Sequence, residues 1–378
     1  MILSRLRLTH VRNHRHSEID CPRGIVLLWG ENGAGKTSVL EAVSMLCTTR
    51  SFVTAQDRTV LSRGEDAMQL HGDFLTDNGV AHTVSFSYPG PNNRKTLLLD
   101  NAPLESASEL FGRFPLVTLS PQHRAITSGG PSERRGFLDF VVSQVHHTYL
   151  LDLIEYRRVL RHRNALLAAH DRSTPALESQ LDPWDAALAA CGVRIMRKRA
   201  AFISEYQPYF EDAMHRIVDG REVPTFRYRS SAEIDCGDAG AAVAFRESLA
   251  RCLNGDVRRG ATSVGPHRDD LDILLNGMDV RAHASQGQHK TLLISLKAGE
   301  WFYLNDHLDE RPMFLLDDVF SELDDERLSR ILRILPALGQ SFITTANQSF
   351  LQHVPALEGG RALYRVDGGT VRAYAEAA

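Results

Sequence analysis

Long apolar runs are missing from this sequence. Its 378 residues are 43% hydrophobic and 24% charged, and no stretch approaches the roughly 20 consecutive apolar residues that span a bilayer. Arginine and histidine interrupt the apolar positions of residues 1–20, so the continuous apolar core of a secretory signal is missing too. We therefore expect a soluble globular protein of the cytoplasm.

Cysteine is scarce, and neither sign of charge dominates. The five cysteines are odd in number, widely spaced and without a CxxC pair: Cys21, Cys47, Cys191, Cys236 and Cys252. This pattern argues against a disulfide framework and against a zinc site. The formal net charge of −4 gives no global attraction to nucleic acid, so any DNA-binding surface must be a local patch.

Internal repeats and low-complexity tracts are also lacking, and hydrophobic patterns organise the first third of the chain. Alternation at residues 2–8 and an apolar run at residues 25–29 predict two strands joined by a turn, with a helix from residue 36. Further strand patterns, separated by Gly, Pro and Asn turns, predict an antiparallel meander at residues 67–75, 82–90 and 94–104.

The middle of the chain is different, because long helical patterns replace the strands at residues 137–170 and 184–218. Strand patterns return at residues 270–280, 313–318 and 341–347, with helical ones at residues 289–304 and 325–335. A chain of this length is comfortable as two lobes. The sequence therefore predicts a discontinuous α/β domain (residues 1–135 and 256–378) with an inserted helical arm (residues 136–255).

A glycine-rich stretch, GENGAGKT at residues 30–37, fits the pattern G-x-x-x-x-G-K-[ST]. Glycines allow consecutive backbone N–H groups to converge on phosphates, where a Cβ would obstruct. Lys36 adds a cation, Thr37 offers a hydroxyl to Mg²⁺, and the following helix presents its positive end. An ordinary glycine turn is the alternative, but the buried strand before it and the amphipathic helix after it favour a nucleotide site.

Two aspartates follow the apolar run at residues 313–316. Asp317 is expected at the carboxyl end of a buried strand, where open α/β sheets bind ligands, and is the candidate for the metal. Asp318 is expected where the strand ends, with its side chain turned toward the phosphates to position or deprotonate water. Taken alone, the pair could simply terminate a strand.

The turn SQGQ, residues 285–288, precedes a long apolar helix. The free N–H groups at such a helix start form an anion site, although an ordinary capped helix explains the letters equally well. Because the glycine-rich loop already accounts for one triphosphate, a second anion site indicates a γ-phosphate held across a dimer.

These motifs together carry a family resemblance. The stretches GENGAGKT, SQGQ and LLDDVFSELD resemble the ABC-type ATPase heads of SMC-like DNA-repair proteins. THVRNHRH, SGGPSERRGFLD, RHRNALL, GVRIMRKR and VGPHRDDL are similar to the pattern of the RecF family, in register from residue 1 to about residue 350. The implied fold is α/β: an ABC-type P-loop ATPase head with an antiparallel β subdomain and an inserted helical lobe, without a long coiled coil.

The resemblance also implies roles for individual residues. Lys36, Asp317 and Asp318 would be catalytic, and Thr37 and Asp317 would hold Mg²⁺, with Gln122 a further candidate. ATP would be bound within one subunit by Arg12, Asn13, Gly30, Glu31, Asn32, Gly33, Ala34, Gly35, Lys36, Thr37 and Ser38. Across a dimer it would be bound by Ser285, Gln286, Gly287, Gln288 and Asp324.

The resemblance to the RecF family implies a function in recombination. The resemblance predicts an ATP-driven homodimer on double-stranded DNA and on single-strand/double-strand junctions, with slow, DNA-stimulated ATP hydrolysis. It also predicts recombinase loading at gaps and stalled forks together with RecO and RecR. Two features depart from the broader ABC pattern. Asp318 replaces the usual Glu, and Thr345 and Asn347 stand where many heads place a sensing His.

Basic residues cluster in the predicted arm. Arg157 and Arg161 are i, i+4 neighbours, as are Arg194 and Lys198, so each pair shares a helix face. Such faces could neutralise DNA phosphates, or they could pair with acidic residues such as Asp152. The full set of candidates is Arg134, Arg135, Arg157, Arg161, Arg194, Lys198 and Arg268.

Three other functions fit parts of the sequence. A transporter ATPase subunit would share the ABC motifs, but the helical insertion argues against it. A P-loop kinase would have no use for the SQGQ turn. A clamp that binds ATP without hydrolysing it would share every motif and differ only in turnover.

Overall fold

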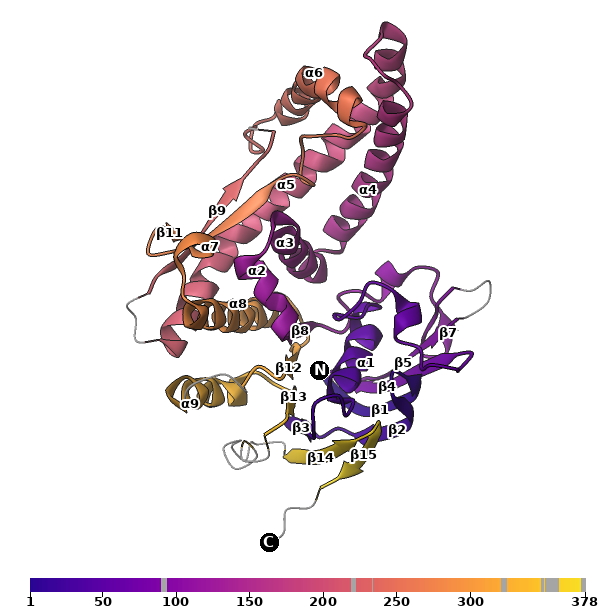
Figure 1. Ribbon diagram of the computed structural model, residues 1–378, viewed down its shortest axis with the longest axis vertical. Coiled ribbons are helices and arrows are strands. Elements are labelled where there is room, and N and C mark those ends of the chain that lie inside the picture. Colours follow the sequence, from indigo (N-terminus) through magenta and orange to yellow (C-terminus); the bar gives the residue numbers. More distant parts are fainter. Residues whose placement is uncertain are drawn as a thin grey trace. The chain divides into compact units, whose positions relative to one another are not determined.

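A computed structural model describes residues 1–89, 94–218, 222–232, 234–320, 325–347, 350 and 360–374 (Figure 1). The chain forms two compact units. The first, which we call the head unit, contains Met1–Arg124, Asp212–Glu222 and Lys290–Ala378, and the second, the arm unit, contains Ala125–Glu211 and Val223–His289. These limits differ from the domain boundaries that the sequence predicts at residues 135 and 256, and those boundaries remain a prediction. Within the described residues, no helix is long and apolar enough to cross a membrane.

A mostly parallel sheet carries the head unit. Its strand order is β15 (Thr370–Ala373), β14 (Arg361–Asp367), β3 (Ile25–Trp29), β13 (Ser341–Thr345), β12 (Met313–Asp317) and β8 (Leu116–Leu119). All neighbours are parallel except β14 and β15. Every residue of β12 and β13 is buried, which explains why residues 313–316 of β12 are apolar without alternation. The predictions of β3, β12 and β13 are confirmed.

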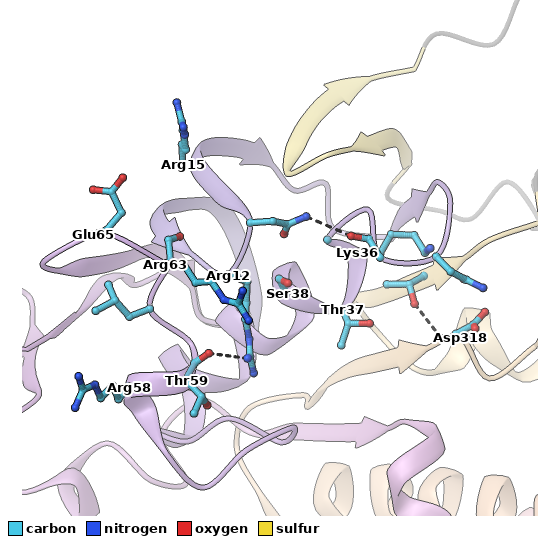
Figure 2. Close-up of a pocket in the computed structure, with 17 residues that line it drawn as sticks. Arg12, Arg15, Lys36, Thr37, Ser38, Arg58, Thr59, Arg63, Glu65 and Asp318 are labelled. Atoms are coloured by element: carbon cyan, nitrogen blue, oxygen red, sulfur yellow. Dashed lines mark hydrogen bonds between the residues drawn. The ribbon is translucent and has the colours of Figure 1, made fainter.

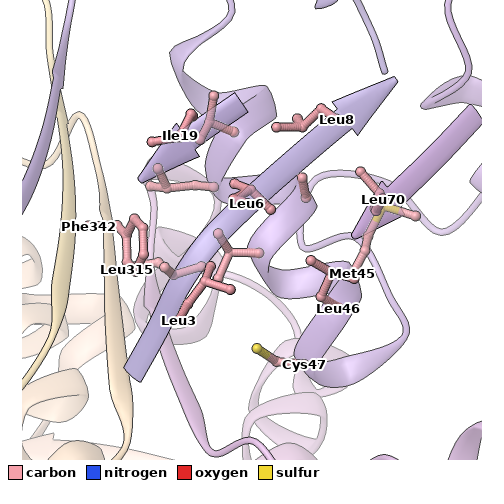
Figure 3. Close-up of a cluster of buried hydrophobic side chains, with 14 of the residues drawn as sticks. Leu3, Leu6, Leu8, Ile19, Met45, Leu46, Cys47, Leu70, Leu315 and Phe342 are labelled. Carbon is pink, nitrogen blue, oxygen red and sulfur yellow. The ribbon is translucent and has the colours of Figure 1, made fainter. Parts of the chain in front are cut away.

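A second sheet in the head unit is antiparallel, in the order β2 (His14–Asp20), β1 (Ile2–Val11), β4 (Met68–Leu75), β5 (Ala81–Tyr88), β6 (Thr96–Leu99) and β7 (Ala102–Pro103). The predicted meander is therefore confirmed. Helix α1 (Lys36–Thr48) contributes Met45 and Leu46 to a core that also contains Leu3 of β1, Leu315 of β12 and Phe342 of β13 (Figure 3). This shared core packs α1 against strands of both sheets.

The expectation of a simple turn between the first two strands was wrong. Residues 14–20 form β2, which pairs with β1. Its inward positions include His14 and Ser17, which are 0% and 5% exposed. Polar residues on the buried face hide the apolar alternation by which a strand is recognised. The hairpin of β14 and β15 also went unpredicted.

Short helices complete the head unit: η1 (Asp57–Thr59), η3 (Ala107–Glu109), η4 (Pro121–His123), α9 (Asp325–Ile334) and η5 (Leu335–Ala337). Helix α8 (Gln286–His307) starts in the arm unit and continues in the head unit. The helix predicted at residues 325–335 is confirmed as α9 and the first residue of η5.

The arm unit is largely helical, as predicted, with α3 (Pro131–Val145), α4 (His147–Ala168), α6 (Ala241–Arg259) and α7 (Val280–His283). The arm unit also contains α2 (Arg124–Ser128) except its first residue, and α5 (Pro175–Ile217) except its last turns, which belong to the head unit. It also contains an antiparallel sheet of β9 (Pro224–Arg229), β10 (Asp270–Leu275) and β11 (Met278–Asp279). Because β9 pairs with β10 along six residues, the segments on both sides of residue 256 fold together.

Buried arginines hold the arm unit together. Arg163 is 0% exposed and donates to Asp185 at 2.6 Å and to Asp256 at 3.1 Å. Arg199, 2% exposed, donates to Asp139 at 2.8 Å and to the hydroxyl of Tyr149 at 3.0 Å. Removing one partner of such a pair leaves an uncompensated buried charge. The basic stretches RHRN and MRKR therefore each contribute a structural residue.

We expect His267 to make the stability of the arm unit depend on pH. Its Nε2 donates to the carbonyl of Thr262 at 3.1 Å, so its Nδ1 accepts from the hydroxyl of Tyr156 at 2.7 Å. Burial, opposed by the Thr262 hydrogen bond and aided by Arg268, lowers the pKa of His267 from 6.5 to about 4. The unfolded chain therefore binds a proton first, and stability present above pH 6.5 is lost as the pH falls, by about 1.4 kcal/mol per unit.

We expect denaturant unfolding to show this loss between pH 7.5 and pH 5, and to show less of it in His267→Gln, which does not titrate. The difference in free energy of unfolding between the two proteins should shrink by about 2 kcal/mol over that range. A difference that stays constant with pH would contradict the neutral, buried state of His267.

Candidate functional site

A cavity of about 970 Å³ opens in the head unit beside the glycine-rich loop (Figure 2). This volume lies at the upper end of the range of about 300–1,000 Å³ that is typical of small-molecule sites. Five cations and two carboxylates face it, which favours a polyanionic ligand. Its lining consists of Arg12, Asn13, Arg15, Asn32, Gly33, Gly35, Lys36, Thr37, Ser38, Arg58, Thr59, Leu61, Ser62, Arg63, Glu65, Asp318 and Thr344.

The glycine-rich loop, residues 30–37, wraps around the Lys36 side chain. The Lys36 ammonium donates to the carbonyls of Gly30 at 2.7 Å and Glu31 at 2.9 Å. Burial lowers the pKa of Lys36, while the nearby carboxylates of Asp318 and Asp317 oppose that shift. Lys36 is therefore already positioned across the loop, with its charge at the cavity wall.

Helix α1 begins at Lys36, directly after this loop. Gly35 occupies the N-cap position at φ 113° and provides no side chain to the first backbone N–H groups. Uncapped N–H groups and the positive end of the helix dipole form an anion site. The cavity therefore combines an ammonium with a helix start, as the sequence predicted.

The first aspartate of the DD pair meets the end of the glycine-rich loop. Asp317 accepts hydrogen bonds from the hydroxyls of Thr37 at 2.8 Å and Thr344 at 2.9 Å, all through Oδ1. Burial raises the pKa of Asp317, and these two hydrogen bonds partly offset the rise. One hydrogen bond thus joins Thr37 and Asp317, which lie 280 positions apart in the sequence.

Thr37 and Asp317 present hydroxyl and carboxylate oxygens, which are the ligands that Mg²⁺ prefers. No group of three or more His, Cys, Asp or Glu side chains in the described residues could hold a metal ion. Mg²⁺ usually takes only one or two protein oxygens and completes its shell with water and substrate phosphates. The residues present therefore fit a nucleotide-bound Mg²⁺ better than an independent metal centre.

Asp318 follows the strand in a left-handed conformation. Strand β12 ends at Asp317, and Asp318 has φ 48°, a region that non-glycine residues rarely occupy. Its backbone N–H donates to the hydroxyl of Thr344 at 2.9 Å, and it lines the cavity (Figure 2). Asp318 therefore faces the cavity, while Asp317 contacts Thr37, which lines it.

Arg12 and Asn13 also line the cavity. Arg12 makes a bidentate pair with Glu41 of α1, at 2.9 and 2.8 Å, and donates to the carbonyl of Thr59 at 2.6 Å. Asn13 donates to the carbonyl of Ala34 at 2.9 Å. Glu41 is only 1% exposed. The sequence does not predict its role, because Glu41 is a single acidic residue within a helix pattern defined by apolar positions.

Some predicted residues are not among those that line this cavity: Gly30, Glu31, Ala34, Asp317, Gln122, Thr345 and Asn347. Gln122 is exposed in η4. Thr345 is buried, and its hydroxyl accepts from the backbone N–H of Asn347 at 3.0 Å. Their roles toward a nucleotide stay predictions.

The SQGQ turn is part of the arm unit. Ser285 caps α8: its hydroxyl accepts from the backbone N–H of Gln288 at 3.2 Å, and the Gln288 side chain accepts from the backbone N–H of Ser285 at 2.9 Å. This reciprocal pattern is a capping box. The helix begins at Gln286, three residues earlier than predicted, so that Gln286, Gly287 and Gln288 form its first turn. Asp324 lies outside the described residues.

The candidate DNA contacts fall into two groups. Arg134 is 1% exposed and donates to Asp270 at 2.8 and 3.0 Å, so the alternative of internal pairing holds for it. Arg135, partly buried, donates to the carbonyl of Asp269 at 2.8 Å. The remaining candidates are exposed: Arg157, Arg161, Arg194, Lys198 and Arg268. Among them, Arg194 pairs with Asp152 at 2.6 Å, a contact that places α4 beside α5.

Comparisons with known proteins agree with this geometry. A family model described as the RecF/RecN/SMC N terminal domain matches residues 2–367. The chain is 39% identical to the DNA replication and repair protein RecF of Chloroherpeton thalassium over 353 residues, which cover 92% of this chain and 95% of the relative. It is 38% identical to RecF of Salinibacter ruber over 370 residues, covering 97% and 89%.

Solved structures show the same likeness. A structure of the recombination mediator protein RecF with ATP, from the RecFOR pathway, matches with a TM-score of 0.89 and 30% identity, covering 99% of this chain and 97% of the other. The Smc head domain of Pyrococcus furiosus matches with a TM-score of 0.56 and 12% identity, over 98% and 95%, and so shares the fold alone. The expected ABC-type ATPase fold is confirmed.

Proposed function

Since this chain belongs to the RecF branch of the RecF/RecN/SMC family, we propose that it acts in DNA replication and repair as an ATP-dependent recombination mediator. The observation that carries the proposal is the cavity of the head unit, where Lys36 and the start of α1 meet the hydrogen-bonded pair of Thr37 and Asp317. ATP and Mg²⁺ are the ligands that this set of groups fits.

In this proposal, residues 30–38 cradle the phosphates of ATP, and Arg12 and Asn13 flank the nucleotide. The Lys36 ammonium exchanges its two carbonyl partners for phosphate oxygens, a stronger, charge-assisted contact. Thr37 and Asp317 hold Mg²⁺, which neutralises phosphate charge when bound. Asp318 orients the attacking water and accepts its proton.

Hydrolysis is slow in this proposal because Asp318 is one methylene shorter than the Glu of most ABC-type heads. A displacement of about 1 Å in such a group can cost roughly 100-fold in rate. The left-handed backbone at Asp318 also fixes the direction from which its carboxylate approaches. ATP therefore serves mainly as a switch between states, with stimulation by DNA.

A homodimer completes the site. The helix start behind Ser285 is capped by its own side chains, and Ser285 and Gln286 are exposed. We assign the turn of a second copy, together with the partner's Asp324, to the γ-phosphate. DNA would then meet exposed basic residues of the arm unit, Arg157, Arg161, Arg194, Lys198 and Arg268, and recombinase loading would involve RecO and RecR.

Asp318→Asn tests the switch against a clamp that never hydrolyses ATP. We expect the variant to lose at least 10-fold in turnover while keeping ATP-dependent dimerisation, because the amide cannot accept the water's proton. Turnover is measured as phosphate release with DNA, and dimerisation as molar mass in solution with ATP, Mg²⁺ and DNA.

The parent protein and Asp309→Asn, which changes a carboxylate outside the cavity lining, serve as controls. A parent protein with no turnover at all would support the clamp instead. A molar mass that is identical with and without ATP would refute the dimer, and with it the proposed role of Ser285.

A further inference from the structure

Two carbonyls of the glycine-rich loop are held on the side away from the cavity. The carbonyl of Ala34 accepts from the backbone N–H of Gly369 at 2.9 Å, in addition to the Asn13 side chain. The carbonyl of Gly35 accepts from Nε2 of His14 at 3.0 Å. His14 is 0% exposed, and Gly369 is buried, so both donors reach the loop from the protein interior.

These contacts orient the N–H groups that a phosphate needs. In a trans peptide, the C=O of one residue and the N–H of the next point in opposite directions. Interior donors on the carbonyls of Ala34 and Gly35 therefore turn the N–H groups of Gly35 and Lys36 toward the cavity, which both residues line. The anion-binding shape of the loop is thus supported by His14 and Gly369, which do not line the cavity, together with Asn13, which does.

Gly369 belongs to the turn of the hairpin that joins β14 to β15, more than 330 positions from the loop. The turn also accepts, through the Gly369 carbonyl, from the hydroxyl of Ser17 at 3.2 Å. Ser17 lies 2.9 Å from Nδ1 of His14, so one chain of contacts connects the hairpin, β2 and the loop. Burial lowers the pKa of His14, and the neutral ring directs its one N–H from Nε2 to the Gly35 carbonyl. The single hydroxyl proton of Ser17 is then shared between the Gly369 carbonyl and Nδ1 of His14.

The hairpin approaches so closely that side chains are excluded. A Cβ on Gly369 would lie 2.0 Å from the carbonyl oxygen of Asn13, and one on Gly30 would lie 2.1 Å from that of Val366. Both obstacles are backbone atoms, which cannot rotate away as a side-chain end would. Gly30, at the start of the loop, is therefore packed against β14, and the hairpin turn at Gly369 is packed against the backbone of Asn13.

We propose that the β14–β15 turn at Gly369, acting with His14 and Ser17, is a positioning element of the nucleotide site that pre-orients the N–H groups of Gly35 and Lys36. The inference rests on the proposed function, because it assigns those N–H groups to the phosphates of ATP. It makes the last strands of the chain a structural part of a loop near its beginning.

Two neighbouring glycines provide a matched pair of variants. Gly368 and Gly369 both have positive φ, 52° and 80°, so alanine strains the turn at either position. A Cβ on Gly368 meets nothing within 4 Å, whereas one on Gly369 meets Asn13. We expect Gly369→Ala to raise the dissociation constant of Mg-ATP about 10-fold more than Gly368→Ala does, measured by calorimetry on the full chain.

His14 provides a second, independent pair that keeps the test valid if Gly369→Ala fails to fold. His14→Leu removes the donor to Gly35, and His14→Gln replaces it with an amide N–H at a similar reach. We expect about 10-fold weaker binding of Mg-ATP in His14→Leu, with KM raised and kcat within about twofold of the parent. In His14→Gln we expect the affinity for Mg-ATP to recover.

The outcomes separate the two claims. If the parent protein binds no ATP, the proposed function fails. If the parent binds ATP and all four variants bind it equally tightly, the hairpin and His14 do not position the loop, and the inference is overturned. Weakened binding in His14→Gln equal to that in His14→Leu would likewise overturn it, because a purely structural loss is not rescued by the donor.

Discussion

Replacing Lys36 with methionine is expected to weaken the binding of Mg-ATP by about 100-fold, because a charged hydrogen bond is worth about 1.5–3 kcal/mol and methionine keeps only the apolar stem. Lys36 is the one cation of the glycine-rich loop, and its ammonium is already held by the carbonyls of Gly30 and Glu31. Little side-chain entropy therefore remains to be lost on binding. Calorimetric titration with Mg-ATP measures the effect.

Arg23→Met is the matched control for Lys36→Met. Arg23 is an exposed cation of the head unit, just before β3, and does not line the cavity. Arg23→Met removes the same formal charge as Lys36→Met. A comparable loss of affinity for Mg-ATP in Arg23→Met would therefore mean that net charge, and not the position of Lys36, controls binding. Unchanged affinity for Mg-ATP in Lys36→Met would mean that the phosphates do not bind at the glycine-rich loop.

Local sequence patterns predicted the parts of the site that depend on local chemistry. The loop at residues 30–37 needs glycines for its backbone, and β12 needs apolar residues because it is buried on both faces. These requirements leave clear marks in the sequence. The sequence assigns Thr37 of the loop and Asp317 of β12 to one Mg²⁺, and the structure brings these two side chains into contact.

Contacts between polar residues far apart in the chain could not be predicted in the same way. His14 interrupts the apolar pattern of β2, yet it supports the Gly35 carbonyl. Glu41 pairs with Arg12, but any of many arginines could have been its partner on sequence grounds. The partner of a buried polar group is fixed by tertiary structure, and one sequence carries no record of that choice.

Basic clusters show the same limit. Arg161 and Arg163 are two positions apart in one helix, but Arg161 is exposed while Arg163 is 0% exposed and paired with two aspartates. Charge alone cannot distinguish a DNA contact from a structural ion pair. The exposed arginines and lysine of the arm unit are the candidates for DNA that burial does not argue against.

Ser285→Arg is expected to abolish ATP-dependent dimerisation while leaving the affinity of the monomer for Mg-ATP within about twofold. The P-loop cavity is lined by residues of the head unit, whereas Ser285 belongs to the arm unit. An arginine at this exposed N-cap places a long side chain where the γ-phosphate of the second copy is proposed to bind, and it removes the hydroxyl that caps α8, at a cost of about 1 kcal/mol. Molar mass in solution, with and without ATP, reports the dimer.

Two companion variants decide between blocking and simple loss of the cap. Ala282→Arg adds the same side chain at an exposed position of α7, three residues earlier, and is expected to dimerise normally. Ser285→Ala removes the cap without the bulk, so it should dimerise more weakly than the parent but not as poorly as Ser285→Arg. If Ser285→Arg dimerises as the parent does, the turn does not face a phosphate across the dimer. The second anion site would then be only a helix cap, and ATP would join the two copies through other residues.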